Sequence, residues 1–179
     1  MADVTFEGRY VVVFSGRRFL APEHTKRVEA AIAGTLEDVI ERVGTKPVVL
    51  LVGMAMGSDH AACRAALRAG VPFHAVVPFT GQTNLWPQAQ KDEWSRLCTF
   101  AEEVHVLHSL TPENPKQAAA WLFGRNSWMV ERAAEGIVVW DGGDRGGTAH
   151  SVGLIRGKGI DWTHIDLQGH VVKFHEGRS

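Results

Sequence analysis

The chain has little cysteine, no excess of charge of one sign and no long apolar run. Its two cysteines, Cys63 and Cys98, fall in separate helical patterns, so we expect two reduced, buried thiols and no disulfide framework. The formal net charge of -1 at pH 7 gives no general attraction for nucleic acid or for an anionic membrane. No stretch approaches the roughly 18 consecutive apolar residues of a membrane helix, and no basic segment precedes the first apolar run. We therefore expect a cytoplasmic protein with no membrane partner.

Short β-branched runs alternate with longer amphipathic segments along the chain. This alternation is typical of an α/β protein with a parallel sheet between helices. We predict one Rossmann-like, three-layer domain over residues 1–179, with a mostly parallel sheet of about five to seven strands, helices on both faces and a C-terminal strand pair at about 160–175. The expected strands are 10–14, 48–52, 73–77, 104–107, 137–140, 162–166 and 171–174, and the expected helices are 22–43, 59–69, 88–101, 116–134 and 148–156.

The most informative segment is 137–148, where a buried-looking strand runs into a turn rich in glycine. Four glycines lie among residues 142–147, and a helix is expected to begin at Thr148. Glycines let the backbone approach a ligand without an intervening Cβ atom, and the free N–H groups of a helix start attract anions. The segment therefore predicts a phosphate-binding turn.

Three other turns follow expected strands, at 15–18, 53–59 and 78–82. Ligands of such sheets bind at the carboxyl ends of the strands, so these turns are candidates for the same site. In the turn 53–59, Ser58 or Asp59 can cap the next helix, which is a purely structural explanation. The functional alternative is a second surface for a phosphate or a ribose. A carboxylate repels phosphate, so Asp59 suits ribose hydroxyls or capping better.

Neither glycine turn matches the dinucleotide fingerprint or the P-loop, so we expect no cofactor. Arginines are nevertheless placed to meet phosphate oxygens, at Arg17, Arg18 and Arg125. Trp86 can stack on a base or pack in the core, and the two alternatives stay open.

The nine histidines do not suggest a metal site. His105 and His108 are three residues apart near a strand end and so point to opposite faces, while His60 and Cys63 have no further ligands nearby in the sequence. We therefore predict that the chain binds no metal.

Five short blocks together resemble a known group of proteins. They are Ser-Gly-x-Arg at 15–18, Gly-Met-Ala-Met-Gly-Ser-Asp at 53–59, Pro-Phe-x-x-Gln-x-x-x-Trp at 78–86, Arg-Asn with a following Met at 125–129, and Gly-Gly-Thr at 146–148. In this order they resemble the SLOG superfamily, which includes the cytokinin-activating phosphoribohydrolases and the DNA-processing protein A fold, and most closely its YpsA-like branch.

This resemblance implies a nucleotide or nucleotide-derived ligand at the glycine turns. The residues expected to bind it are Ser15, Gly16, Arg17, Gly53, Gly57, Ser58, Asp59, Pro78, Phe79, Gln82, Trp86, Arg125, Asn126, Gly146, Gly147 and Thr148. Arg125 matches an arginine of the hydrolases, but Ala149, His150 and Ser151 stand where that branch has acidic residues after the threonine. Cleavage of an N-glycosidic bond usually requires a carboxylate, so the departure favours binding over hydrolysis.

Three functions are compared on these grounds. The first is a sensor or binding module for a nucleotide-derived ligand. The second is a phosphoribohydrolase-like enzyme acting on nucleoside 5′-monophosphates, with Arg125, His150 and Asp141 as candidate catalytic residues, although an aspartate in a glycine turn commonly bonds its own backbone. The third is binding of single-stranded DNA, for which Arg17, Arg18 and Arg9 are too few. We therefore expect no nucleic acid partner, while a homodimer is compatible with this fold group.

Overall fold

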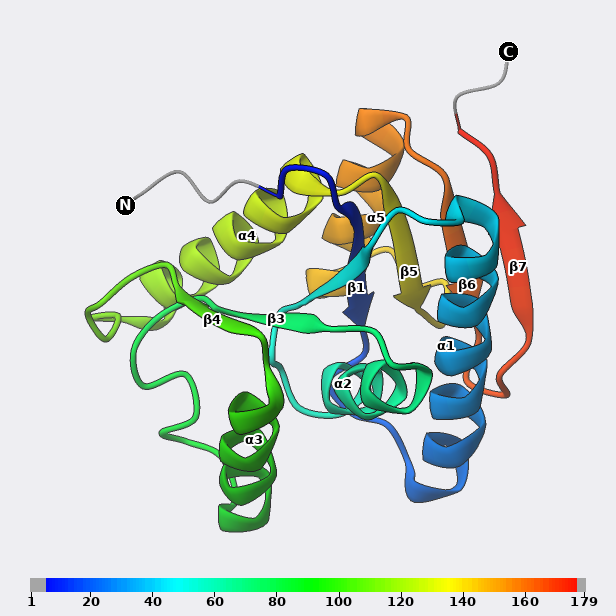
Figure 1. The fold of residues 1–179 in the computed structure, drawn as a ribbon. Helices are drawn as coiled ribbons and strands as arrows, with labels where there is room; N and C mark the ends of the chain where they lie inside the picture. The colour runs from blue at the N-terminus through cyan, green and yellow to red at the C-terminus, as the bar shows by residue number, and fades with distance from the viewer. Residues whose placement is uncertain (1–5, 177–179) are drawn as a thin grey trace.

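Seven strands form a single sheet in the order β4-β3-β2-β1-β5-β6-β7 (Figure 1). The computed structural model describes residues 6–176. The strands are β1 (Tyr10–Gly16), β2 (Val48–Val52), β3 (Phe73–Val77), β4 (Glu103–Val106), β5 (Glu135–Val139), β6 (Trp162–Ile165) and β7 (Val171–Phe174). Neighbouring strands are parallel except for β6 and β7, which form an antiparallel pair at one edge.

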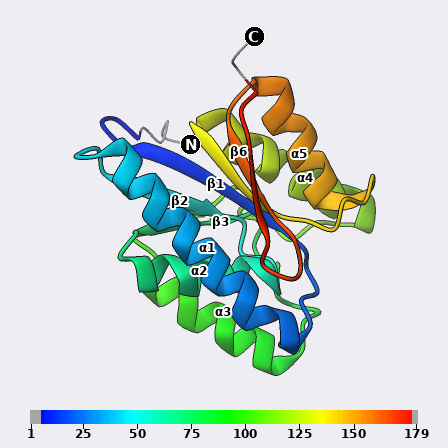
Figure 2. The same ribbon diagram turned by 90° about the vertical axis from the view of Figure 1, so that its right-hand side faces the viewer.

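Helices cover both faces of this sheet. They are α1 (Pro22–Val43), α2 (Ser58–Ala69), α3 (Gln88–Phe100), α4 (Pro115–Arg132) and α5 (Gly146–Lys158). Figure 2 shows α1, α2 and α3 on one side of the sheet and α4 and α5 on the other. The predicted fold class, a Rossmann-like three-layer α/β fold with a mostly parallel sheet, is confirmed. Within residues 6–176, no helix combines the length and the hydropathy needed to cross a bilayer.

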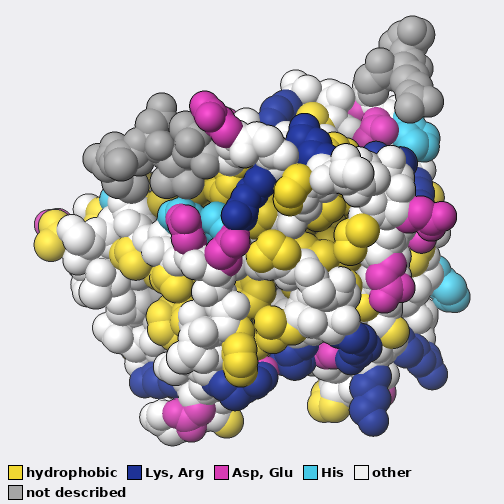
Figure 3. Space-filling model, viewed as in Figure 1, with side chains coloured by type: hydrophobic (Ala, Val, Ile, Leu, Met, Phe, Trp, Pro, Cys, Tyr) yellow, Lys and Arg dark blue, Asp and Glu magenta, His cyan; other side chains and the backbone are white. Residues whose placement is uncertain are grey.

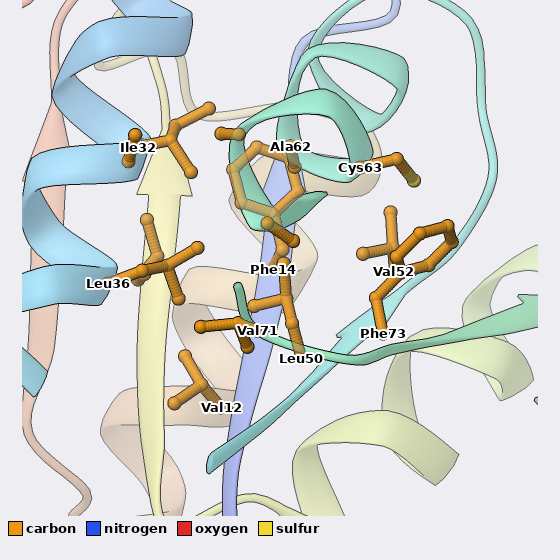
Figure 4. Close-up of a cluster of buried hydrophobic side chains, with 14 of the residues drawn as sticks. Val12, Phe14, Ile32, Leu36, Leu50, Val52, Ala62, Cys63, Val71 and Phe73 are labelled. Carbon is orange, nitrogen blue, oxygen red and sulfur yellow. The ribbon is translucent and has the colours of Figure 1, made fainter. Parts of the chain in front are cut away.

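The strand residues divide between two hydrophobic cores because side chains alternate across a strand. Val12 and Phe14 of β1 pack under α1 and α2, in the cluster that Figure 4 shows. Val11 and Val13 of the same strand pack on the opposite face, under α4 and α5. Both faces of the central strands are thus buried, which explains why these strands read as continuous apolar runs.

The glycine-rich turn is shorter than predicted, because α5 begins at Gly146 and not at Thr148. Arg145 takes the extended N-cap conformation, and Gly146 follows with φ +92°. The only apolar residue of this first helical turn is Ala149, so the start of the helix could not be located from periodicity. Gly146 and Gly147 therefore belong to the N-terminus of the helix, where their backbone N–H groups face outward from its first turn.

Candidate functional site

A cavity of about 390 Å³ lies at the carboxyl ends of the central strands. Four segments form it: the end of β1 with the following loop, the β2–α2 turn, α4, and the first turn of α5. Its lining residues are Phe14, Ser15, Gly16, Arg18, Ala55, Asp59, Ala119, Leu122, Phe123, Arg125, Asn126, Met129, Gly146, Gly147 and Thr148. The structure thus brings together residues from four of the five blocks that the sequence singled out.

Arg125 is the buried cation of this cavity. It lies on α4 with only 7% of its surface exposed. Its guanidinium donates to the carbonyl of Gly53, and Nε donates to Oδ1 of Asn126 at 2.9 Å. Burial lowers the pKa of Arg125, while the nearby Asp59 carboxylate acts in the opposite direction. Among residues 6–176, its hydrogen-bond acceptors are neutral. An anion in the cavity would therefore add a charged partner at hydrogen-bonding distance.

Asp59 lines the same cavity from the first turn of α2. Burial raises the pKa of this carboxyl to about 6, although Arg125 opposes the shift. Its Oδ2 accepts a hydrogen bond from the backbone N–H of Ala55 at 2.9 Å. The expectation that Ser58 or Asp59 caps α2 is wrong, because the N-cap is Gly57 and no side chain caps the helix. Asp59 points back toward the preceding turn instead.

The glycines of the first two turns allow the segments to approach closely. A Cβ atom at Gly53 would overlap the guanidinium of Arg125, and one at Gly16 would overlap the side chain of Ser58. Gly57 has φ +78°, and a Cβ atom there would meet the carbonyl of Arg18. These glycines shape the cavity, and of the three only Gly16 lines it.

Ser58 joins the β2–α2 turn to the loop after β1. It is fully buried, and its backbone N–H and its hydroxyl both donate to the carbonyl of Arg17, at 3.0 and 2.8 Å. Both of its donors are therefore used inside the protein. The structure places Ser58 beneath the cavity, as a support for the loop that carries Arg18.

The N-terminus of α5 forms one wall of the cavity. No side chain caps this helix, so the backbone N–H groups of its first turn remain available to an anion. Asn126 donates to the carbonyl of Gly147 at 3.2 Å, and Ser15 donates to Ser151 at 3.0 Å. These bonds hold the helix start against β1 and α4.

The block at 78–86 lies outside the cavity. Pro78 is buried, and Phe79 packs against Trp121 with ring centroids 5.9 Å apart. Gln82 donates to the carbonyls of Gly53 and Met54, so it supports the β2–α2 turn. Trp86 is half-buried beside His60, with ring centroids 6.1 Å apart.

The candidate catalytic side chains Asp141 and His150 do not line the cavity either. Asp141 forms an ion pair with Arg17, which links the turn after β5 to the loop after β1. His150 packs against Phe123 with ring centroids 4.7 Å apart, and burial lowers its pKa. The carboxylate that lines the cavity with Arg125 is Asp59, for which the sequence predicted capping or contact with a ribose.

A groove of about 1040 Å³ continues from the cavity along the same edge of the sheet. Arg18 lines both, and its side chain forms no hydrogen bond or ion pair with another residue in the part of the chain that the structure describes. Beside it, Phe19 is 75% exposed, and Lys26 lines the groove from α1. Figure 3 shows Lys and Arg side chains gathered along the lower edge of the molecule, toward which β1 and β5 point in Figure 1.

Phe19 and Lys26 were not predicted as site residues from the sequence. An aromatic residue directly after two arginines was the available signal. Arg9, which was counted with Arg17 and Arg18, lies at the opposite end of β1 and pairs with Glu102. Arg9 therefore does not belong to the carboxyl edge of the sheet.

Comparison with known proteins supports the expected superfamily. A model of the family described as DNA recombination-mediator protein A matches residues 25–164. No curated protein matches the chain significantly. Among solved structures, DNA processing protein A from Streptococcus pneumoniae has 25% identity and a TM-score of 0.62, with 87% of this chain and 50% of that protein covered. The chain thus spans about half the length of that protein.

Two further structures share the fold. DNA processing protein A from Helicobacter pylori has 16% identity and a TM-score of 0.60, with 88% of this chain and 66% of that protein covered. TM1055, from a structural genomics programme, has 13% identity and a TM-score of 0.50, with 84% of this chain and 71% of that protein covered.

The Helicobacter pylori protein is described as having a unique mode of binding single-stranded DNA. Together with the family match, this finding contradicts the expectation that nucleic acid is not a partner. That expectation used the net charge of the whole chain and a count of three arginines, and neither describes one edge of the molecule. Because the family model matches well over half of its residues, this chain belongs to the DNA recombination-mediator protein A family and is a member of the SLOG superfamily.

Proposed function

We propose that this chain binds single-stranded DNA along the carboxyl edge of its sheet, with one backbone phosphate in the cavity. The observation that carries the proposal is the buried guanidinium of Arg125 opposite the uncapped N-terminus of α5. Backbone N–H groups at a helix start and a guanidinium are both preferred partners of phosphate oxygens. The family match supports DNA as the source of that phosphate.

The groove beside the cavity supplies the other elements that single-strand binding requires. Proteins of this kind combine cations that follow the backbone with aromatic side chains on which bases stack. Arg18 and Lys26 provide cations, and Phe19 provides an exposed ring in the same groove. The ion pair of Arg17 with Asp141 positions the loop that carries Arg18 and Phe19.

A free nucleotide or nucleotide-derived ligand is a second candidate for the cavity. Its volume of about 390 Å³ falls in the range of small-molecule sites, and its walls include the apolar side chains of Leu122, Phe123 and Met129. Competition of a nucleoside monophosphate against a labelled oligonucleotide separates the two candidates. Displacement at micromolar nucleotide supports a dedicated nucleotide site, whereas displacement only by oligonucleotides supports DNA.

Hydrolysis of an N-glycosidic bond is an enzymatic alternative that one observation favours. Asp59 places a carboxyl group in the cavity, and its pKa of about 6 suits acid–base catalysis near neutral pH. Release of free adenine from AMP, abolished in Asp59→Asn, would support this activity. No release at high protein concentration would exclude it for AMP.

Arg18→Gln and Phe19→Ala are each expected to weaken binding of a labelled oligothymidylate by about tenfold. Arg18 loses a phosphate contact, and removal of the Phe19 ring removes stacking that is worth about 1–3 kcal/mol per base. Fluorescence anisotropy of the labelled strand measures both effects.

The matched controls for these variants lie at the other end of the sheet. Arg9→Gln removes an arginine beside Glu102, and Phe100→Ala removes an exposed ring at the end of α3. Both controls should bind as the wild type does. Equal losses in the controls and in the two test variants would contradict binding at the carboxyl edge.

Binding of single-stranded DNA is also expected to tighten as the pH falls from 7.5 to 5.5. Asp59, with a pKa of about 6, is ionised at the higher pH and partly neutralises Arg125. Its protonation at the lower pH removes a negative charge from the cavity, so a phosphodiester gains affinity by a few fold. His60, whose pKa burial lowers to about 4, stays neutral over this range.

The anisotropy titration, repeated at both pH values with a strand that has no terminal phosphate, measures this change. The dependence should disappear in Asp59→Asn. If that variant retains the full dependence of the wild type, another group is responsible and the assignment to Asp59 fails.

A further inference from the structure

Three potential metal ligands lie together on β3 and β4, outside the cavity and the groove. Their ligand atoms, on His74, Glu103 and His105, all lie within 4.8 Å of one another. Strand register brings them together: His74 of β3 is the direct partner of Glu103 on β4. His105 lies two residues after Glu103, so its side chain projects from the same face of the strand.

Two of the three spacings between these atoms are close to those of a tetrahedral site, one of them the hydrogen bond between the two imidazoles. Nδ1 of His74 lies 3.0 Å from Nε2 of His105, and Nε2 of His105 lies 3.4 Å from Oε2 of Glu103. Two ligands of a tetrahedral zinc ion, each about 2.0–2.1 Å from the metal, are about 3.3 Å apart. Small side-chain rotations therefore suffice to point the three ligand atoms at one ion.

The other ring nitrogen of His74 has the partner that zinc-binding histidines usually have. Its Nε2 lies 2.9 Å from Oε2 of Glu102, so it donates its proton there and leaves Nδ1 as the ligand atom. Glu102 is itself held by Arg9, whose Nη2 donates to Oε1 at 3.0 Å. A carboxylate that orients a histidine in this way raises its basicity as a ligand.

The cluster is also accessible from solvent. The side chain of His74 is 4% exposed and that of His105 11%, whereas that of Glu103 is 57% exposed. Trp128 of α4 packs beside His105 with ring centroids 5.5 Å apart. One buried imidazole, one partly buried imidazole and one exposed carboxylate leave the fourth position of a tetrahedral ion for water.

We propose that His74, His105 and Glu103 bind one divalent transition-metal ion, with Zn²⁺ as the best fit to two imidazoles and one carboxylate. The ion joins the edge strand β4 to β3. This site is independent of the DNA-binding proposal, because its residues lie outside the cavity and the groove. The two cysteines compete poorly for the metal, since burial raises the pKa of Cys98 to about 11 and raises that of Cys63 as well.

Titration calorimetry of the untagged, metal-free chain with Zn²⁺ tests the proposal. We expect saturable binding of about one ion per chain, weakened at least tenfold in His105→Gln and in Glu103→Gln. His108→Gln is the matched control, because His108 stacks on Trp121 at 4.1 Å, outside the cluster. It should bind Zn²⁺ as the wild type does.

A second readout keeps the test independent of calorimetry. Zn²⁺ at about 100 times its Kd should raise the midpoint of thermal unfolding by about 5 °C or more in the wild type and in His108→Gln, and not in His105→Gln. Glu102→Gln should lower the affinity about tenfold while leaving the stoichiometry unchanged. If no saturable binding is seen up to about 100 μM Zn²⁺, the association constant is below roughly 10⁴ M⁻¹ and the proposal is overturned. Equal binding by His105→Gln and the wild type overturns it as well.

Discussion

Replacing Arg125 with methionine is expected to weaken the binding of a single-stranded oligonucleotide by about 30-fold or more, equivalent to about 2 kcal/mol. The reason is that Arg125 presents a buried cation to the cavity, where water competes little for a phosphate. Arg125→Lys should bind with intermediate affinity, because lysine keeps the charge but loses the planar fork that reaches the Gly53 carbonyl and Asn126 together. Anisotropy titration measures both variants.

Stability must be followed in the same experiment, since the change removes the cation that acts most strongly on the buried Asp59. The double variant Arg125→Met/Asp59→Asn removes both charges and so avoids leaving a buried carboxylate without Arg125. It should still bind the oligonucleotide weakly, because the cation is gone. Circular dichroism confirms that each variant is folded. Wild-type affinity in a folded double variant would show that Arg125 does not contact the nucleic acid.

Gly53→Ala is expected to disturb both the fold and the site. A Cβ atom at this position would overlap the guanidinium of Arg125 and lie 2.9 Å from its Nε. The guanidinium cannot stay where it is, so binding should fall to about the level of Arg125→Met. Overpacking of this kind typically costs about 1–3 kcal/mol of unfolding free energy. Urea denaturation measures the stability, and anisotropy measures the affinity.

Gly34→Ala is the matched control for this substitution. Gly34 lies inside α1, and nothing lies within 4 Å of the position that its Cβ atom would take. Alanine there should stabilise the protein by roughly 0.5–1 kcal/mol and leave binding unchanged. If Gly53→Ala were as stable and as active as Gly34→Ala, the close approach of Gly53 to Arg125 would have no functional importance.

The strands of the sheet and their parallel class could be predicted from local patterns. Apolar runs such as Val48–Val52 identify buried strands without any knowledge of their neighbours. The rule that ligands bind at the carboxyl ends of parallel strands then located the turns at 53–59 and 142–147 on one edge. Arg125 was predicted to meet phosphate oxygens, and the family resemblance gave a second argument for it. Helical periodicity alone does not show which side of α4 faces the sheet edge.

The roles of Ser58 and Gln82 could not be predicted, because they depend on contacts with distant segments. Ser58 bonds the carbonyl of Arg17, and Gln82 bonds the carbonyls of the β2–α2 turn. Residue type alone does not distinguish a polar side chain that supports a turn from one that faces a ligand. The same limit applies to charge, since a total of -1 conceals the cations gathered along one edge.

The histidine cluster illustrates the limit most clearly. Along the chain the nearest histidine to His105 is His108, and the spacing of these two residues makes their side chains diverge. The relevant partner is His74, which is 31 residues away in sequence and reaches His105 through the pairing of β3 with β4. Strand order and register are tertiary properties, so a ligand set divided between two strands has no local signature.

The salt dependence of binding tests the central claim most directly. The wild-type chain is titrated with a labelled oligothymidylate at several salt concentrations, and log K is plotted against log[salt]. Arg18, Lys26 and Arg125 are the cations of the cavity and groove that form no ion pair within the described residues, and three neutralised phosphates of a single strand predict a slope of about -2. We predict saturable binding with that slope, reduced by about 0.7 in Arg18→Gln. No saturable binding at low salt, or a slope that Arg18→Gln leaves unchanged, would contradict the account.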